Sequence, residues 1–396
     1  MTNGKDTVCS ICHGEIGPDV YGRIMCYGCG PYELLPHERR DLRPPQSVRP
    51  AAMNALVYRG AGTYGLEERP RPELKGPGDA IVRILCTSIS STDLHILKGD
   101  APEVAPGRIL GHEAVGVIEQ VAGGVTGFRR GDHVLVSSIT SCGRCAACRR
   151  GMTSNCEEGG WALGRHIDGT HAEYVRVPFA DYGLHKVPAG VDEDALALLS
   201  DVFPTGHECG VLSGAVKPGD VVCVVGAGPV GLAALMTAQL YSPAQVIVVE
   251  PDDFRLETAR RLGATAGVGA GATAARVLEL TNGRGIDVAI EAVGLPETFE
   301  LCEDVVAPGG HIANVGVHGR PATLRLQKLW SRNVTITTRL VDAVTIPLLL
   351  ETVRTGRLDP RKLVTHTFRF EQLEVAYRTF ANAAANKALK VLIKNG

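Results

Sequence analysis

The sequence predicts an α/β protein in which a β-rich domain is followed by a doubly wound parallel sheet. Between residues 203 and 341, short apolar runs alternate with helical patterns, as they do in a parallel sheet covered on both faces. Residues 51–202 instead hold short strand-like runs separated by glycine-rich turns, which is typical of an irregular β-rich domain. A length of 396 residues allows two such domains and a small appendage.

Residues 1–50 are that appendage, and they contain two Cys-x-x-Cys pairs with thirteen residues between them. This spacing predicts a zinc ribbon, because so short a segment cannot bury enough apolar surface to fold without a metal. A redox-active pair of dithiols is the alternative interpretation. The charged, proline-rich stretch PHERRDLRPPQSVRP then predicts a linker. The expected zinc ligands are Cys9, Cys12, Cys26 and Cys29.

The β-rich region contains the runs AIVRILCTSI, EAVGVIEQV and DHVLVSS, and a loop with four further cysteines. These cysteines follow the pattern Cys-x-x-Cys-x-x-Cys-x7-Cys, and four thiolates in one loop complete a tetrahedral zinc site. Such a site has no open coordination position, so we expect it to stabilise the loop and to perform no chemistry. Its ligands would be Cys142, Cys145, Cys148 and Cys156.

A glycine-rich turn follows the strand DVVCVV in the third region and precedes a small-residue helix. Glycines in this pattern permit the tight turn and allow the backbone to approach a pyrophosphate closely. The N-terminus of the helix then offers unpaired N–H groups to the phosphates. The motif therefore predicts a dinucleotide site at Gly226, Gly228, Pro229, Val230 and Gly231.

The choice between NAD and NADP depends on the end of the next strand. Glu250 lies at the distance at which such folds place the carboxylate that binds the adenosine ribose hydroxyls. Asp252 and Asp253 add negative charge, which would repel a 2′-phosphate, so the sequence favours NAD. Arg255 is a further cofactor-site candidate and leaves NADP open.

The overall charge argues against two classes of partner. The chain has 41 Lys and Arg against 43 Asp and Glu, so it lacks the basic excess needed for non-specific binding to nucleic acids or membrane surfaces. Residues 1–50, the N-terminal head, have six residues of each sign and so lack such an excess as well. No apolar run reaches the ~18 residues of a membrane span, and MTNGKDTVCS lacks the apolar core of a secretory signal. We therefore expect a cytoplasmic protein.

Residues 53–396 resemble the zinc-containing medium-chain alcohol dehydrogenases. The resemblance rests on STDLH at 91–95, GHEAVG at 111–116, the four-cysteine loop, SDVFPTG at 200–206 and the glycine motif. It implies a GroES-like catalytic domain, formed by residues 51–202 and 342–396, packed on a Rossmann domain at residues 203–341. It also implies NAD as cofactor, an alcohol or carbonyl substrate, and a homodimer or homotetramer.

The implied catalytic zinc site departs from the family at one position. The family's usual cysteine ligand is replaced by Ser90, whereas His112 and Asp201 match the other two ligands. A hydroxyl is a neutral, hard and poor ligand, so zinc should bind more weakly unless the neighbouring Glu113 restores the missing charge. Three explanations stay open: an engineered substitution, a natural carboxylate-rich site, or a chain that lost its catalytic metal.

The resemblance also assigns roles in the reaction, a reversible hydride transfer between an alcohol and NAD that yields an aldehyde or ketone. Thr92 would take the alcohol proton, His95 would release it near solvent, and Asp93 would orient a metal ligand. A metal-poor NAD(P)-binding reductase is the alternative. Trp161 would line the substrate pocket or simply pack. The remaining cofactor-site candidates are Lys390, matching a basic residue for the pyrophosphate, and Val293, Val315 and Val317.

Overall fold

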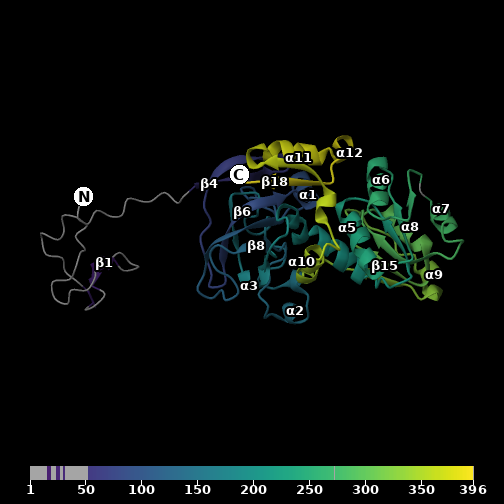
Figure 1. Cartoon of the computed structure of the whole chain (residues 1–396), viewed down its shortest axis with the longest axis horizontal. Helices are drawn as coiled ribbons and strands as arrows, with labels where there is room; N and C mark the ends of the chain where they lie inside the picture. The colour runs from purple at the N-terminus through teal and green to yellow at the C-terminus, as the bar shows by residue number, and fades with distance from the viewer. Residues whose placement is uncertain (1–15, 19–23, 27–29, 32–51, 272, 396) are drawn as a thin grey trace. The chain divides into compact units, whose positions relative to one another are not determined.

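The computed structural model describes residues 16–18, 24–26, 30–31, 52–271 and 273–395 (Figure 1). The chain divides into two compact units, residues 1–51 and 52–396. In the first unit, three short strands form an antiparallel sheet: β1 (Ile16–Pro18), β2 (Ile24–Cys26) and β3 (Gly30–Pro31). Cys9, Cys12, Cys29 and the side chain of Cys26 lie outside the described residues, so the N-terminal zinc site stays a prediction.

The second unit begins with a hairpin of β4 (Ala52–Gly60) and β5 (Thr63–Pro70) and continues into a seven-stranded sheet. The sheet order is β10-β8-β7-β6-β18-β17, and β9 also pairs with β6. Leu392 of β18 lies opposite Ser88 of β6, so the C-terminal strands complete a sheet begun near residue 80. The strands are β6 (Ala80–Ser88), β7 (Ala114–Val121), β8 (His133–Val136), β9 (Tyr174–Val177), β10 (Leu184–Lys186), β17 (Val364–Arg369) and β18 (Lys390–Lys394).

The three predicted strands of the β-rich region are thereby confirmed as β6, β7 and β8. Short helices connect the strands of this sheet. The α-helices are α1 (Ser91–Lys98), α2 (Ala146–Arg149), α3 (Ala180–Gly183), α11 (Leu373–Ala381) and α12 (Ala383–Asn386). The 3₁₀ turns are η2 (Thr153–Asn155), η7 (Pro360–Leu363) and η8 (Phe370–Gln372).

The second sheet is parallel throughout, in the order β13-β12-β11-β14-β15-β16, with helices packed around it (Figure 1). Every residue of the central strand β11 is buried, as expected for a strand covered on both faces. The strands are β11 (Val221–Val225), β12 (Gln245–Val249), β13 (Ala266–Val268), β14 (Ile286–Glu291), β15 (Val306–Asn314) and β16 (Thr335–Thr338). The helices are α5 (Pro229–Ala238), η5 (Gln239–Tyr241), α6 (Asp253–Arg261), α7 (Ala274–Glu279), α8 (Pro296–Val305), α9 (Leu326–Leu329) and η6 (Trp330–Arg332).

The predicted α/β architecture is confirmed, and the strand order reverses between β11 and β14, where such sheets bind dinucleotides. Two segments connect the sheets. One runs through η3 (Asp194–Ser200), α4 (Val202–Pro204) and the π-helix η4 (Thr205–Leu212), and the other returns through α10 (Ile346–Arg354). Apolar residues of η3, α4, α5 and α10 share one core cluster, which holds these segments together. Among the described residues, no helix has the length and hydropathy needed to cross a bilayer.

Candidate active site

Ser90 occupies the N-cap of α1, where it satisfies backbone groups that the helix leaves unpaired. Its Oγ accepts a hydrogen bond from the Thr92 N–H at 3.3 Å, and its own N–H donates to Oδ2 of Asp93 at 2.8 Å. Serine is among the most favourable N-cap residues, so this position has a structural reason for a hydroxyl. The departure from the family's cysteine therefore stabilises the start of α1.

Asp93 connects the start of α1 to the segment that carries His112. Its Oδ1 accepts a hydrogen bond from the Gly111 N–H at 3.2 Å, and its side chain is buried. Gly111 has a φ of +90°, and a Cβ at this residue would lie 2.5 Å from Cδ2 of His171, so only glycine fits. These contacts hold the backbone beside His112 in place.

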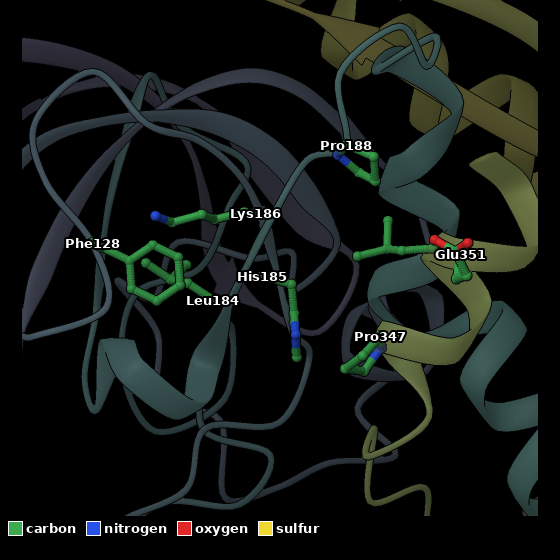
Figure 2. A pocket seen from close by; sticks show the side chains of 8 residues that line it. Phe128, Leu184, His185, Lys186, Pro188, Pro347 and Glu351 are labelled. Atoms are coloured by element: carbon green, nitrogen blue, oxygen red, sulfur yellow. The ribbon is translucent and has the colours of Figure 1, made fainter.

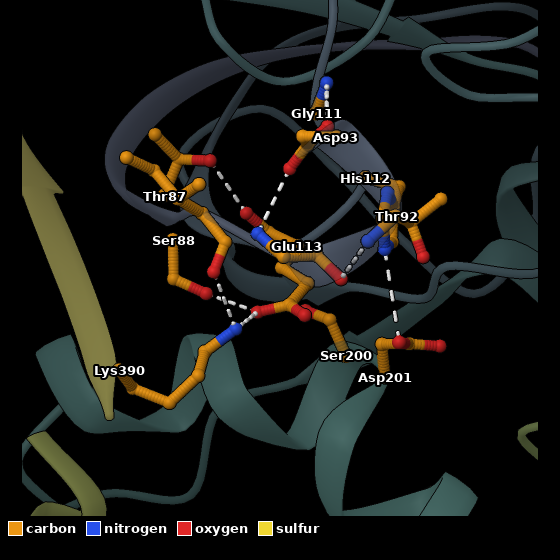
Figure 3. Close-up of polar contacts among 12 residues, drawn as sticks. Thr87, Ser88, Thr92, Asp93, Gly111, His112, Glu113, Ser200, Asp201 and Lys390 are labelled. Carbon is orange, nitrogen blue, oxygen red and sulfur yellow. Dashed lines mark hydrogen bonds and ion pairs between the residues drawn. The ribbon is translucent and has the colours of Figure 1, made fainter. Parts of the chain in front are cut away.

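His112, Glu113 and Asp201 form the candidate metal centre (Figure 3). One ligand atom from each lies within 4.8 Å of the others, and Nε2 of His112 lies 3.7 Å from Oδ2 of Asp201. Burial by itself lowers the pKa of His112, but the hydrogen bond and charge of Asp201 outweigh it and raise the pKa to about 9. Burial raises the pKa of Asp201, but the hydrogen bond and charge of His112 hold it below its usual value. The donors are thus those of a nitrogen and oxygen cation site.

Glu113 also forms a buried ion pair with Lys390. Its Oε2 lies 2.7 Å from Nζ of Lys390 and accepts a hydrogen bond from the Ser88 hydroxyl, while Lys390 also donates to the Ile89 carbonyl at 2.8 Å (Figure 3). Burial raises the pKa of the Glu113 carboxyl, against the charges of Lys390 and His112. Oε1 of Glu113 is buried and has no hydrogen-bond partner among the described residues. Because a buried unpaired oxygen is costly, a cation bound by His112 and Asp201 fits this site.

The four-cysteine loop is assembled as the spacing predicts. Its four Sγ atoms lie within 4.8 Å of one another, and backbone N–H groups donate to three of them at 3.3–3.5 Å. Hydrogen bonds of this kind lower the pKa of Cys145 to about 6, which favours the thiolate form that binds metal. The structure therefore contains a four-cysteine structural zinc site, formed by Cys142, Cys145, Cys148 and Cys156.

The glycine turn lies between β11 and α5 as predicted. A Cβ at residue 231 would lie 1.9 Å from the Gly226 carbonyl oxygen, whereas a Cβ at Gly228 would meet nothing within 4 Å. The backbone at Gly228 is therefore open to a ligand at the N-terminus of α5. Glu250 follows β12, and its carboxylate accepts hydrogen bonds from the Ala227 N–H at 2.7 Å and the Asp252 N–H at 3.0 Å. The carboxylate thus lies against the turn, where the ribose of a dinucleotide is expected.

The other predicted cofactor residues differ in their exposure. Val293 and Val317, which follow β14 and β15, are 42% and 80% exposed, and Val315 is partly buried. Lys390 is 1% exposed and donates to Glu113, and its contact with a pyrophosphate stays a prediction. Arg255 lies in the first turn of α6.

The predicted relay residues both lie on α1 but in different environments. Thr92 is partly buried in the first turn, and His95 is exposed, with Nδ1 2.8 Å from Oδ2 of Asp100. Trp161 is partly buried and packs against two apolar core clusters, the one shared by η3, α4, α5 and α10 and a second shared by α1 and α11. Its ring centroid lies 6.3 Å from that of His112. Trp161 therefore packs beside the metal centre.

Two buried polar residues near the site were not predicted from the sequence. Ser88 lies at the end of the largely apolar strand β6, and nothing in its local sequence pattern indicates a contact with Glu113. Glu208 lies seven residues after Asp201 in a stretch that is otherwise mostly apolar, and its carboxylate is buried. A lone charge in such a stretch is a signal that could have been used, because buried carboxylates require partners.

A separate cavity of about 340 Å³ lies between β10 and α10 (Figure 2). Phe128 and His185 line one side of it, and Pro347 and Glu351 line the other. Burial lowers the pKa of His185 to about 4, so its imidazole is neutral at pH 7. None of the residues of the metal centre or the four-cysteine loop lines this cavity.

Comparison with known proteins agrees with this geometry. Residues 76–189 match the family model of the alcohol dehydrogenase GroES-like domain, and residues 229–353 match that of the zinc-binding dehydrogenases. An alcohol dehydrogenase of Cupriavidus necator is 36% identical over 366 residues, which cover 87% of this chain and 99% of the relative. The chain belongs to the zinc-containing medium-chain alcohol dehydrogenase family.

Other members of this family extend the match. The apo structure of zinc dependent alcohol dehydrogenase 2 from Streptococcus pneumonia has a TM-score of 0.83 and 47% identity, covering 87% of this chain and 98% of that chain. An NADP-dependent isopropanol dehydrogenase of Thermoanaerobacter brockii is 34% identical, covering 82% of this chain and 95% of the relative. As a member of this family, the protein is a zinc-dependent oxidoreductase that acts on alcohols with NAD(P).

Proposed function

We propose that the protein transfers hydride reversibly between a small alcohol and NAD, using a catalytic metal bound by His112, Asp201 and Glu113. The observation that carries this proposal is the three-residue cluster itself, in which one carboxylate oxygen of Glu113 is buried without a partner among the described residues. When bound there, zinc supplies a Lewis acid for the alcohol oxygen. Of the three explanations for Ser90, this cluster favours a natural, carboxylate-rich site.

The residues of α1 provide the proton path in this proposal. The Thr92 hydroxyl accepts the proton of the alcohol as it gives up its own proton toward His95, and His95 releases a proton to solvent. The partial burial of Thr92 and the exposure of His95 support this order, because the proton then moves outward along one face of a helix. Residues three positions apart lie on the same helix face, as Thr92 and His95 do. Asp93 holds the backbone beside His112 and is a positioning residue.

NAD is the cofactor that the ribose site favours. The carboxylate of Glu250 already accepts two backbone N–H groups near the glycine turn, so a 2′-phosphate placed there would meet a fixed negative charge. Glu250→Gln removes this charge while keeping the size of the side chain. We expect the ratio of kcat/KM for NAD to that for NADP to fall in this variant. An unchanged ratio would show that Glu250 does not select the cofactor.

The substrate class is tested by measuring NADH formation with a panel of short alcohols, polyols and hydroxy-amino acids. We expect turnover with at least one member, and greater turnover by the Ser90→Cys variant if the serine weakens metal binding. No turnover by either protein would overturn the proposal. NAD binding together with turnover that a chelator does not reduce would instead favour the metal-poor reductase.

The open edge of the parallel sheet supports pairing between two copies of the chain. β16 is the last strand in the sheet order, and near it Trp330 is 78% and Leu326 is 59% exposed. An edge strand beside exposed apolar residues is suited to pairing with a second copy of the chain. We therefore propose a homodimer through this edge, which light scattering would detect, and Trp330→Lys should shift it toward monomer.

The N-terminal head is proposed to bind one zinc through Cys9, Cys12, Cys26 and Cys29. The spacing of the two Cys-x-x-Cys pairs supports this assignment. Zinc analysis of the chain with Cys9 and Cys12 both replaced by serine should show one zinc fewer than the unaltered chain. An unchanged zinc content would contradict the assignment.

A further inference from the structure

Glu208 has a carboxylate whose oxygens are fully used by one short loop. Oε2 accepts hydrogen bonds from the Asp342 N–H at 2.9 Å and the Ala343 N–H at 3.1 Å. Oε1 accepts from both the backbone and the hydroxyl of Thr345, at 2.8 and 2.9 Å. Thr345 is the N-cap of α10, so the charge of Glu208 also lies at the positive end of that helix. One buried carboxylate thus holds the loop and the helix start together.

The same loop is bound from its other side by the four-cysteine loop. Oδ1 of Asp342 accepts hydrogen bonds from the backbone N–H of Ser154 at 2.9 Å and from its hydroxyl at 2.7 Å. Thr153 donates its hydroxyl to the Asp342 carbonyl. Both residues belong to η2, directly before the zinc ligand Cys156. Asp342 therefore links the structural zinc loop to the segment that Glu208 holds.

Glu208 itself lies on η4, which begins four residues after Asp201. The Thr205 N–H donates to the Asp201 carbonyl at 2.8 Å, so the π-helix continues directly from the metal-site residue. Phe203 of α4 and Ile346 of α10 are buried in one core cluster, which adds a packing contact to the polar one. The connection thus runs without interruption from the four-cysteine loop to Asp201.

We propose that Glu208 and Asp342 are positioning residues that hold Asp201 in its metal-binding place by tying η4 to the structural zinc loop. This inference rests on the proposed role of Asp201 as a metal ligand. Residues that orient metal ligands from outside the ligand set typically contribute about 10–100-fold to metal affinity. The structural zinc loop is then coupled to metal binding at Asp201, although the structural zinc itself takes no part in the reaction.

The test measures cobalt binding in the full chain after a chelator has removed the exchangeable metal. Co²⁺ is titrated in, its visible absorption gives the affinity of the site, and zinc analysis verifies that the four-cysteine site stays loaded. Glu208→Gln should weaken Co²⁺ binding about 10-fold, since an amide cannot accept all four hydrogen bonds. Asp342→Asn should weaken it as well, and should also speed zinc release from the four-cysteine loop.

A matched control and a milder variant separate positioning from a general loss of structure. Glu351→Gln makes the same chemical change on α10, where Glu351 is exposed and pairs with Arg354, and should leave Co²⁺ affinity unchanged. Thr345→Val removes one hydrogen bond to Glu208 without changing the side-chain shape and should weaken binding about 2–3-fold, as expected for one modest hydrogen bond. Thr345→Val keeps the inference testable if Glu208→Gln fails to fold.

The outcomes distinguish this inference from the function on which it rests. The combined Glu208→Gln and Asp342→Asn variant should bind Co²⁺ no more weakly than the more affected single variant, because both substitutions break the same connection. Additive losses, or Co²⁺ affinity unchanged in Glu208→Gln and Thr345→Val, would overturn the inference. Asp201→Asn with unchanged Co²⁺ affinity would instead overturn the ligand role of Asp201, and with it the proposed function.

Discussion

The ammonium of Lys390 lies 2.7 Å from Oε2 of Glu113, and both side chains are almost completely buried. The pair joins β18, near the C-terminus, to the residue before β7, across 277 positions of sequence. Ser88 adds a hydrogen bond to the same oxygen. The C-terminal strand thus supplies the charge that balances a carboxylate of the metal centre.

Replacing Lys390 should destabilise the protein strongly. Lys390→Met leaves Glu113 buried without its counter-charge, a change that typically costs about 3–5 kcal/mol. Urea unfolding should show this loss, whereas Lys186→Met should cost less than ~1 kcal/mol, since Lys186 is 61% exposed and 3.4 Å from Asp132. Equal effects of the two substitutions would contradict a buried pair.

The zinc content should divide into tight and weak sites. Closed four-thiolate sites couple their metal to folding, so we expect two zincs per chain to survive dialysis against a chelator. A third should be substoichiometric and lost, because Ser90 brings no charge, Lys390 balances the charge of Glu113, and an open position admits water. Ser90→Cys should fill the third site and raise turnover.

Retention of all three zincs would show that the weak-site prediction is wrong. Glu113 would then bind the metal tightly enough to make up for the missing thiolate. In that case Glu113→Gln should remove one zinc and the activity together and leave NAD binding intact, which calorimetry can measure separately.

Stability should fall in mild acid because of His185 beside the cavity (Figure 2). Burial lowers its pKa in the folded protein to about 4 from 6.5, so the unfolded chain takes up the proton first as the pH falls. The loss therefore begins near pH 6.5 and reaches about 3 kcal/mol at pH 4. His185→Phe should make the loss of stability between these values shallower, whereas the same substitution at the exposed His166 should leave it unchanged.

Two glycines of the cofactor turn should respond differently to alanine. A Cβ at Gly231 would lie 1.9 Å from the Gly226 carbonyl oxygen, so Gly231→Ala should lower the melting temperature. At Gly228 the Cβ would meet nothing within 4 Å, so Gly228→Ala should melt normally but bind NAD more weakly, because it fills space needed by the pyrophosphate. Thermal melts and NAD titrations would check both, and normal NAD binding by Gly228→Ala would place the phosphates elsewhere.

Features that depend on neighbours along the chain could be predicted from the sequence. Apolar runs predicted β6, β7, β8 and β11, cysteine spacing predicted the structural zinc loop, and the glycine pattern predicted the turn before α5. These features are readable because each is built from residues within about twenty positions, whose types reflect local backbone geometry and shared ligation.

Contacts between residues far apart in the sequence became visible only in the folded chain. Lys390 carries no local signal for Glu113, and Glu208 carries none for the loop at Asp342 and Thr345. Their side chains come together because strand pairing and helix packing fold separate segments onto one another, and each buried charge must then find its partner there. The role of Ser90 as a helix N-cap likewise became visible only once the start of α1 was placed.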